Sequence, residues 1–170
     1  MKRIYSFFVI FLLFTAFLIP ATLMQKLFVV KKIFPDAKNI VVLFNKKMIS
    51  SNITREASIA KTALKLNIIL VDVEKKSALG SVSNKYIKSG IHYVIIYSDS
   101  AIFNPLGKRL ICQKAIKKKI PVITDVKDDF KLGAFASIEE NDGKIFIYVS
   151  KKVSSILGVK IPEDPKIIIK

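Results

Sequence analysis

The sequence predicts an α/β protein: a single doubly wound, Rossmann-like domain with a mainly parallel sheet of five to six strands, preceded by a signal or anchor helix. Three observations support this prediction. Short apolar runs alternate with longer stretches of helical periodicity from residue 22 onward. Several of these runs are continuously apolar, as expected for strands that are covered on both faces. The length of 170 residues suits one domain once an N-terminal segment is subtracted.

Residues 1–21 have the pattern of a targeting segment. Lys2 and Arg3 form a short positive start, and residues 4–19 are almost wholly apolar, which is typical of a secretory signal peptide. The apolar run is short for a transmembrane helix of about 20 residues, although the residues after it extend it. Both a cleaved signal peptide and a retained anchor in the inner membrane therefore stay open. In either case the domain, residues 22–170, is expected to be periplasmic or otherwise extracytoplasmic.

The first half of the domain alternates between amphipathic helices and apolar strands. Apolar residues recur at helical spacing in each helix, Pro35 stops the first helix, and Ser51 or Asn52 is positioned to cap the second. The predicted elements are a helix at 22–34, a strand at 39–44, a helix at 53–64, a strand at 68–73 and a helix at 77–88.

The second half begins with the same alternation and then departs from it. A stripe of Ile145, Val149, Val153 and Ile156 at helical spacing predicts a last helix, which Gly158 ends. The remaining predicted elements are a strand at 93–97, a helix at 106–119, a strand at 121–124, a strand at 134–138 and an edge strand at 167–169. Strands that alternate with helices predict a parallel sheet covered on both faces, with right-handed crossovers.

The chain is strongly basic, with a formal net charge of +16, or +14 without Lys2 and Arg3. Such a charge attracts anionic lipid, polyanions or acidic partners; the alternative is a solvated, lysine-rich surface without a specific partner. The sequence contains no basic motif interleaved with aromatic residues, so nucleic acid is not a predicted partner. Cys112 is the only cysteine, which excludes an internal disulfide. Its apolar neighbours predict a buried structural thiol.

The known catalytic and cofactor-binding signatures are missing from this sequence. It contains no GxGxxG, P-loop, GxSxG, HExxH or CxxC motif. His92 is the only histidine, so neither a Ser-His-Asp triad nor a two-histidine metal site can be built. Its place at the start of the third strand predicts a structural role. We therefore expect no enzymatic activity, no cofactor and no metal.

Polar side chains follow the predicted strands, where doubly wound sheets bind their ligands. These residues are Asn45, Asp72, Ser98, Asp99, Thr124 and Asp125. Asp99 and Asp125 follow neighbouring strands, so they are placed either to form a carboxylate pair for acid–base work or cation binding, or to cap helices and line polar loops. A phospho-receiver domain would need an acidic pair after the first strand, where Asn45 is followed by two lysines.

Five segments resemble, in the same order, the ABC-transporter substrate-binding family with a type 1 periplasmic-binding fold. They are FPDAKNIVVLFN at 34–45, GIHYVIIYSD at 90–99, KIPVIT at 119–124, GAFAS at 133–137 and SILGVKIP at 155–162. The resemblance covers only the second of the two lobes of such proteins. It departs from the family after residue 137, where two tyrosines usually follow.

The resemblance implies an extracytoplasmic solute-binding module that holds a small molecule at the carboxyl ends of its strands. Its implied ligand-facing positions are Asn45, Ser50, Ser51, Ser98, Asp99, Thr124, Ala136 and Ser137. The implied partners are an unidentified small solute, a membrane permease or sensor protein, or a second lobe supplied in trans. The alternative is a non-catalytic interaction or sensory-partner protein with a vestigial cleft, which docks on a membrane protein or an anionic surface.

Overall fold

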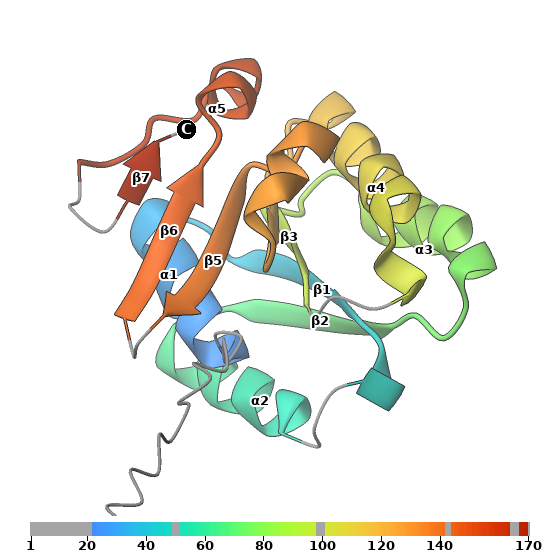
Figure 1. Ribbon diagram of the computed structural model, residues 1–170. Helices are drawn as coiled ribbons and strands as arrows, with labels where there is room; N and C mark the ends of the chain where they lie inside the picture. Colours follow the sequence, from blue (N-terminus) through green and yellow to red (C-terminus); the bar gives the residue numbers. More distant parts are fainter. Residues whose placement is uncertain (1–21, 49–51, 98–100, 142–143, 164–166, 170) are drawn as a thin grey trace, which may run out of the picture.

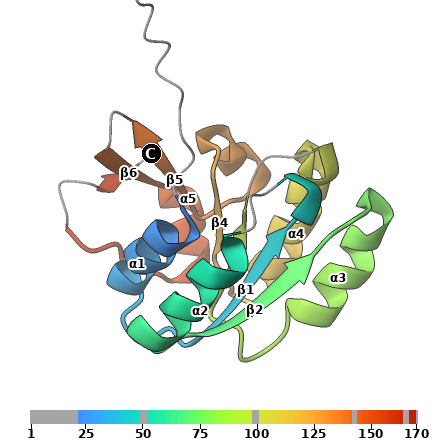
Figure 2. The same cartoon turned by 90° about the horizontal axis from the view of Figure 1, so that it is seen from below.

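The structure is a computed structural model that describes residues 22–48, 52–97, 101–141, 144–163 and 167–169. This part of the chain forms one sheet of seven strands in the order β2-β1-β3-β4-β5-β6-β7, with helices on both faces (Figures 1 and 2). The strands are β1 (Asn39–Phe44), β2 (Asn67–Asp72), β3 (Tyr93–Ile96), β4 (Val122–Thr124), β5 (Ala136–Asn141), β6 (Lys144–Val149) and β7 (Ile167–Ile169). The predicted α/β fold is confirmed, with one or two strands more than expected.

The helices divide between the two faces of the sheet. The view in Figure 2 shows α1 and α2 on one side of the sheet and α3 and α4 on the other. The helices are α1 (Leu23–Ile33), α2 (Ile53–Ala63), α3 (Leu79–Tyr86), α4 (Pro105–Lys117) and α5 (Lys151–Leu157), joined by the 3₁₀ turns η1 (Lys46–Met48), η2 (Lys76–Ala78), η3 (Ala101–Phe103) and η4 (Lys127–Leu132). Local signals set several starts: Thr22 and Gln25 form a capping box on α1, and Asn104 caps α4.

Two hydrophobic cores lie on the two faces of the sheet. Successive residues of β1 point to opposite faces, so Ile40 and Val42 join the core with α1 and α2, whereas Val41 and Leu43 join the core with α3 and α4. The pairing of β1 with β2 and β3, and of β4 with β3 and β5, is parallel. Both cores are built from residues 23–167, so the chain after residue 21 has what an independently folding domain needs.

The predicted helix over Ile145–Ile156 is wrong in its first half. Residues 144–149 form β6, which pairs antiparallel with β5, and α5 begins only at Lys151. In the sequence KIFIYV, aliphatic residues at 145, 147 and 149 alternate with aromatic residues at 146 and 148, and both kinds favour strands. Ile145 and Val149 belong both to this alternation and to the predicted helical stripe, so they fit either period. The Asp-Gly pair between the two strands is typical of hairpin loops.

Smaller differences concern the ends of elements. The predicted helix at 77–88 divides into η2 and α3, and the strand predicted at 134–138 is displaced to Ala136–Asn141. Asn52 occupies the N-cap position of α2 without forming a side-chain capping bond, and Ser51 lies outside the described residues. The predicted signal or anchor at 1–21 also lies outside them and stays a prediction. None of the helices that the structure describes combines the length and apolar content needed to cross a membrane.

Cys112 is fully buried in the core between the sheet and α4. Burial, with a smaller effect of the nearby Asp129 charge, raises the pKa of Cys112 to about 12. At pH 8 the thiolate, which is the reactive form, is then on the order of a thousandfold scarcer than for an ordinary thiol. We expect iodoacetamide at pH 8 to leave Cys112 unmodified in the folded protein and to modify it in urea. If Cys112 in the folded protein reacted as fast as free cysteine in the same sample, this prediction would be wrong.

Candidate functional site

The carboxyl ends of β1 to β5 lie at one edge of the sheet, which we call the carboxyl edge. Because these five strands are parallel, the residues that follow each of them come together there. The chain leaves β1 for α2 on one face and leaves β3 for α4 on the other (Figure 2). The connections after neighbouring strands thus diverge between β1 and β3. In open α/β sheets, ligands bind in the crevice that such a divergence creates.

Asn45 joins the connections after β1 and β2. Its side-chain Nδ2 donates to the carbonyl of Val73 at 2.8 Å, and its Oδ1 accepts from the backbone N–H of Lys47 at 3.0 Å. The backbone N–H of Lys46 donates to the carboxylate of Asp72 at 2.9 Å. Asn45 is only 3 % exposed, so its buried amide fixes the two connections relative to each other at the carboxyl edge.

Thr124 ends β4, whereas Ala136 and Ser137 are the first two residues of β5, beside the end of β4, and do not follow the fifth strand as expected. Thr124 pairs in register with Ser137, and all three residues are at most 1 % exposed. The hydroxyl of Thr124 donates to the carbonyl of Val126 at 3.2 Å. The hydroxyl of Ser137 has no hydrogen-bond partner among the described residues. The structure therefore brings these predicted positions together beneath the surface of the carboxyl edge.

The other predicted site residues, Ser50, Ser51, Ser98 and Asp99, lie outside the described residues. The predicted approach of Asp99 to Asp125 is therefore not described either. A shallow hollow of about 390 Å³ lies at the same edge, next to the end of β2, and is lined by Asp72, Glu74, Lys75, Ser77 and Ala78. The eight predicted site residues remain predictions.

A buried lysine at the carboxyl edge is the main feature that sequence reasoning missed. Lys26, in the first turns of α1, is 0 % exposed and forms an ion pair with Asp125, which follows β4. Its Nζ also lies 4.1 Å from the centroid of the Tyr97 ring, which follows β3. A cation over an aromatic face is attracted by the negative face of the ring. Carboxylate and ring together thus enclose an ammonium group at the centre of this edge.

Glu56, at the start of α2, completes this group of ionisable residues. Its carboxylate accepts from the backbone N–H of Met24 at 3.1 Å. Burial lowers the pKa of Lys26, and the charges of Asp125 and Glu56 partly offset that effect. Burial also raises the pKa of Tyr97 to about 12, with smaller contributions from the same two carboxylates. Lys26 falls between Leu23 and Val30 in the i, i+3, i+4, i+7 pattern of the buried stripe, and this signal was available in the sequence.

His92 lies at the opposite edge of the sheet, as its place before β3 predicts. Its Nδ1 accepts a hydrogen bond from the backbone N–H of Asn39 at 3.2 Å. It lines a hollow of about 340 Å³ together with residues 33–37, Val159 and Lys160. No group of three or more potential metal ligands occurs within the part of the chain that the structure describes. The arrangement at the carboxyl edge suits non-covalent binding through hydrogen bonds and charge.

Comparisons with known proteins agree with this geometry. A family model described as ABC transporter substrate binding protein matches residues 20–168. No curated protein matches the sequence. Among solved structures, the chain is similar to a ligand-free, open substrate-binding protein with adhesive properties from Clostridium difficile, with 16 % identity and a TM-score of 0.70. That match covers 88 % of this chain and 60 % of the other.

Two further solved structures share the fold. A conserved domain protein from Vibrio cholerae has 16 % identity and a TM-score of 0.65, and the match covers 82 % of this chain and 56 % of that one. An ABC domain in complex with L-Trp from Streptococcus pneumonia has 16 % identity and a TM-score of 0.62, with 82 % and 57 % covered. The chain thus spans less than two thirds of the length of each of these proteins, as expected for a resemblance to one lobe.

Proposed function

The chain belongs to the family of ABC transporter substrate-binding proteins, and from this premise we propose that it is an extracytoplasmic solute-binding module that holds a small molecule at the carboxyl edge. Proteins of this family bind a small solute for an ABC permease, and they usually work outside the cytoplasm. The proposal gives residues 1–21 the role of a signal peptide or an inner-membrane anchor. It gives the protein no catalytic role and no cofactor.

The divergence of the chain between β1 and β3 is the observation that carries this proposal. The backbone N–H of Tyr97 donates to the carbonyl of Leu43 at 2.8 Å, so the ends of the two strands are held side by side. Asn45 and Tyr97 thus follow the two strands between which the connections diverge, which is the position where doubly wound sheets bind their ligands. The family resemblance implies a ligand at this same edge.

We propose different roles for the two groups of predicted site residues. Asn45, Thr124, Ala136 and Ser137 are at most 3 % exposed and would form the floor of the site. Ser50, Ser51, Ser98 and Asp99 are the positions that we propose to contact the solute. The complex of one structural neighbour with L-Trp makes aromatic amino acids the first class of solute to test.

A thermal-shift screen tests this function directly. We expect one solute among amino acids, nucleosides, aromatic acids and sugars to stabilise the protein by about 1.4 kcal/mol at ten times its Kd, which corresponds to a rise in Tm of about 3–6 °C. Asp99→Ala is expected to abolish the shift. Asp128→Ala is the matched control, because Asp128 is an exposed carboxylate that pairs only with exposed Lys131 at 3.3 Å.

If no solute in the panel raises the Tm at millimolar concentration, the proposed solute site is contradicted. Retention of the shift in Asp99→Ala together with its loss in Asp128→Ala would also contradict the proposed site. The control is informative because both variants change the net charge equally.

The second candidate is an interaction or sensory-partner protein whose cleft no longer binds a solute. The observation that favours it is the ion pair between Lys26 and Asp125, which already occupies the carboxyl edge beside Tyr97. Its partner would be a membrane protein, such as a permease or a sensor, or an anionic surface. This candidate would be favoured if no solute in the screen raises the Tm and such a membrane protein is captured from native membranes.

A further inference from the structure

The layer formed by α3 and α4 is basic throughout. We call the described residues 75–92 and 101–119 the basic layer, because they contain ten lysines and arginines and no aspartate or glutamate. These ten residues are Lys75, Lys76, Lys85, Lys88, Lys108, Arg109, Lys114, Lys117, Lys118 and Lys119. Lys108 is buried and pairs with Asp129 at 2.9 Å. The remaining charges have no acidic neighbour within the layer itself.

The acidic residues of the described chain gather elsewhere. Eight of the ten lie at the carboxyl edge or in the turns that follow it: Glu56, Asp72, Glu74, Asp125, Asp128, Asp129, Glu139 and Glu140. Asp36 and Glu163 are the other two. A uniformly lysine-rich surface would not separate the two signs in this way, so the charge of the basic layer is a local feature of the fold.

Exposed lysines concentrate where α3 and α4 meet. Lys85 and Lys88 lie at the end of α3, and Lys117 and Lys118 lie at the end of α4; all four are exposed. A hollow of about 330 Å³ between the helices is lined by Ser83, Asn84, Ile87, Lys114, Lys117 and Lys118. In it, the Nζ of Lys114 donates to Asn84 Oδ1 at 2.5 Å and to the carbonyl of Gly80 at 3.3 Å, which fixes the two helices together.

This arrangement places like charges close together on one part of the surface. Lys114, Lys117 and Lys118 are spaced i, i+3 and i+4 on α4, and like charges at these spacings destabilise a helix. Among the residues that the structure describes, no carboxylate forms an ion pair with Lys85, Lys88, Lys117 or Lys118. An anionic partner would therefore relieve the repulsion between these lysines.

An apolar side chain stands on the same face. Leu106 is 69 % exposed and shares an outward stripe of α4 with Arg109, Gln113 and Lys117, all of which are exposed. A large apolar residue on a helix face that also carries basic residues is the combination that binds at the boundary of headgroups and acyl chains. Nine of the ten basic residues are lysines, which act as point charges and lack the fork that arginine offers to one fixed phosphate.

We propose that the α3/α4 face docks on an anionic phospholipid surface, with Lys85, Lys88, Lys117 and Lys118 over the headgroups and Leu106 inserted among them. This inference is independent of the proposed solute site, which lies at the carboxyl edge. It also fits the prediction that the apolar residues 4–19 form a signal peptide or membrane anchor. The face would hold the domain near the membrane in which a permease or sensor resides.

Sedimentation of residues 22–170 with lipid vesicles tests the proposal. We expect binding to phosphatidylcholine vesicles that contain about a third phosphatidylglycerol, and none to phosphatidylcholine alone, because the attraction comes from anionic lipid. Changing Lys85, Lys88, Lys117 and Lys118 to glutamine should weaken binding by about fivefold for each lysine at the surface. Binding by the unchanged protein should also fall as salt is raised.

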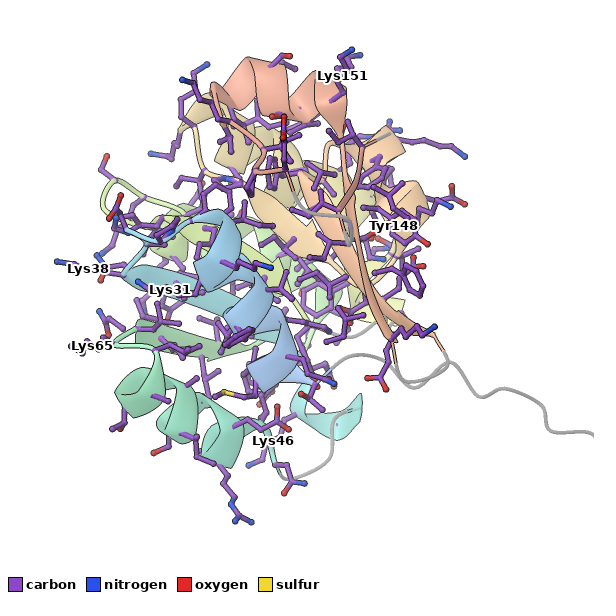
Figure 3. All side chains as sticks on the ribbon, turned by 90° about the vertical axis from the view of Figure 1, so that its left-hand side faces the viewer. Lys31, Lys38, Lys46, Lys65, Tyr148 and Lys151 are labelled. Carbon is purple, nitrogen blue, oxygen red and sulfur yellow. The ribbon has the colours of Figure 1, made fainter. Side chains whose placement is uncertain are left out.

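The matched control removes the same charge from other surfaces. Lys38→Gln, Lys61→Gln, Lys151→Gln and Lys152→Gln change exposed lysines outside the basic layer, and Figure 3 shows Lys38 and Lys151 far apart on the side of α1. This variant should lose far less affinity. Equal losses in the two variants, or equal binding to neutral vesicles, would overturn the proposal. Leu106→Gln should weaken binding several-fold, and unchanged vesicle binding by that variant would overturn the proposed insertion of Leu106.

Discussion

Replacing Asp125 by alanine is expected to lower the free energy of unfolding by about 3–5 kcal/mol, because it leaves a buried ammonium without its counter-charge. Lys26 is 0 % exposed, and its Nζ forms an ion pair with Asp125 and lies over the face of Tyr97. Water cannot replace the lost carboxylate at a fully buried nitrogen. Urea unfolding followed by circular dichroism measures the change. A loss below about 1 kcal/mol, the range of exposed pairs, would contradict it.

Two further variants separate the charge pair from its surroundings. Lys26→Met keeps an unbranched side chain in the same space, and the double variant Lys26→Met with Asp125→Ala should recover most of the stability, since replacing both partners of a buried pair is often nearly neutral. Asp128→Ala is the matched control. Its side chain is 82 % exposed and pairs with exposed Lys131, so the expected change is within about 0.5 kcal/mol.

The pH dependence of the same pair has a definite sign. Burial lowers the pKa of Lys26 in the folded protein below its ordinary value of 10.5. Between these two pKa values the unfolded chain binds more protons than the folded protein, so stability rises with pH. If Lys26→Met has a higher free energy of unfolding than the unchanged protein, that difference should therefore shrink as the pH is raised through that window towards 10.5.

Replacing Phe135 by alanine is expected to lower the free energy of unfolding by about 3–5 kcal/mol, because the change removes a large ring from a closed core. Phe135 is 0 % exposed and immediately precedes β5. Its ring centroid lies 5.5 Å from that of Phe34, which follows α1. Phe34 in turn stacks on Tyr93 of β3 at 6.1 Å. The three rings join α1, the parallel strands and the β5–β6 hairpin.

The Phe135 variant also tests whether the sheet unfolds as one unit. Because the rings connect both halves, we expect a single transition with a lower midpoint by circular dichroism. Phe28→Ala is the control: Phe28 is 61 % exposed, and its removal should change stability by no more than about 0.5 kcal/mol. Two separate transitions in Phe135→Ala, or equal effects of the two variants, would contradict the predicted role of the ring cluster.

The sequence by itself determined the fold class, and the physical reason is periodicity. The run at residues 40–44 is continuously apolar, and all five residues are buried in β1, as expected for a parallel strand covered on both faces. The end of the last helix at Gly158 was equally predictable, because glycine favours the left-handed conformation found there. Strand–helix alternation also predicted that Asn45 and Thr124 follow strands that end at one edge of the sheet, whereas Ser137 was implied only by the family resemblance.

Only the tertiary structure decided what each of these positions contacts. Residues 145–149 fit both a helical and a strand period, and pairing with β5 makes them a strand. A local sequence pattern does not reveal backbone partners that lie outside the segment. Lys26 fits the buried stripe of α1 by spacing, yet its burial depends on Asp125, which is 99 residues away. The basic layer is likewise a product of folding, since lysines scattered along the chain come together only when α3 packs beside α4.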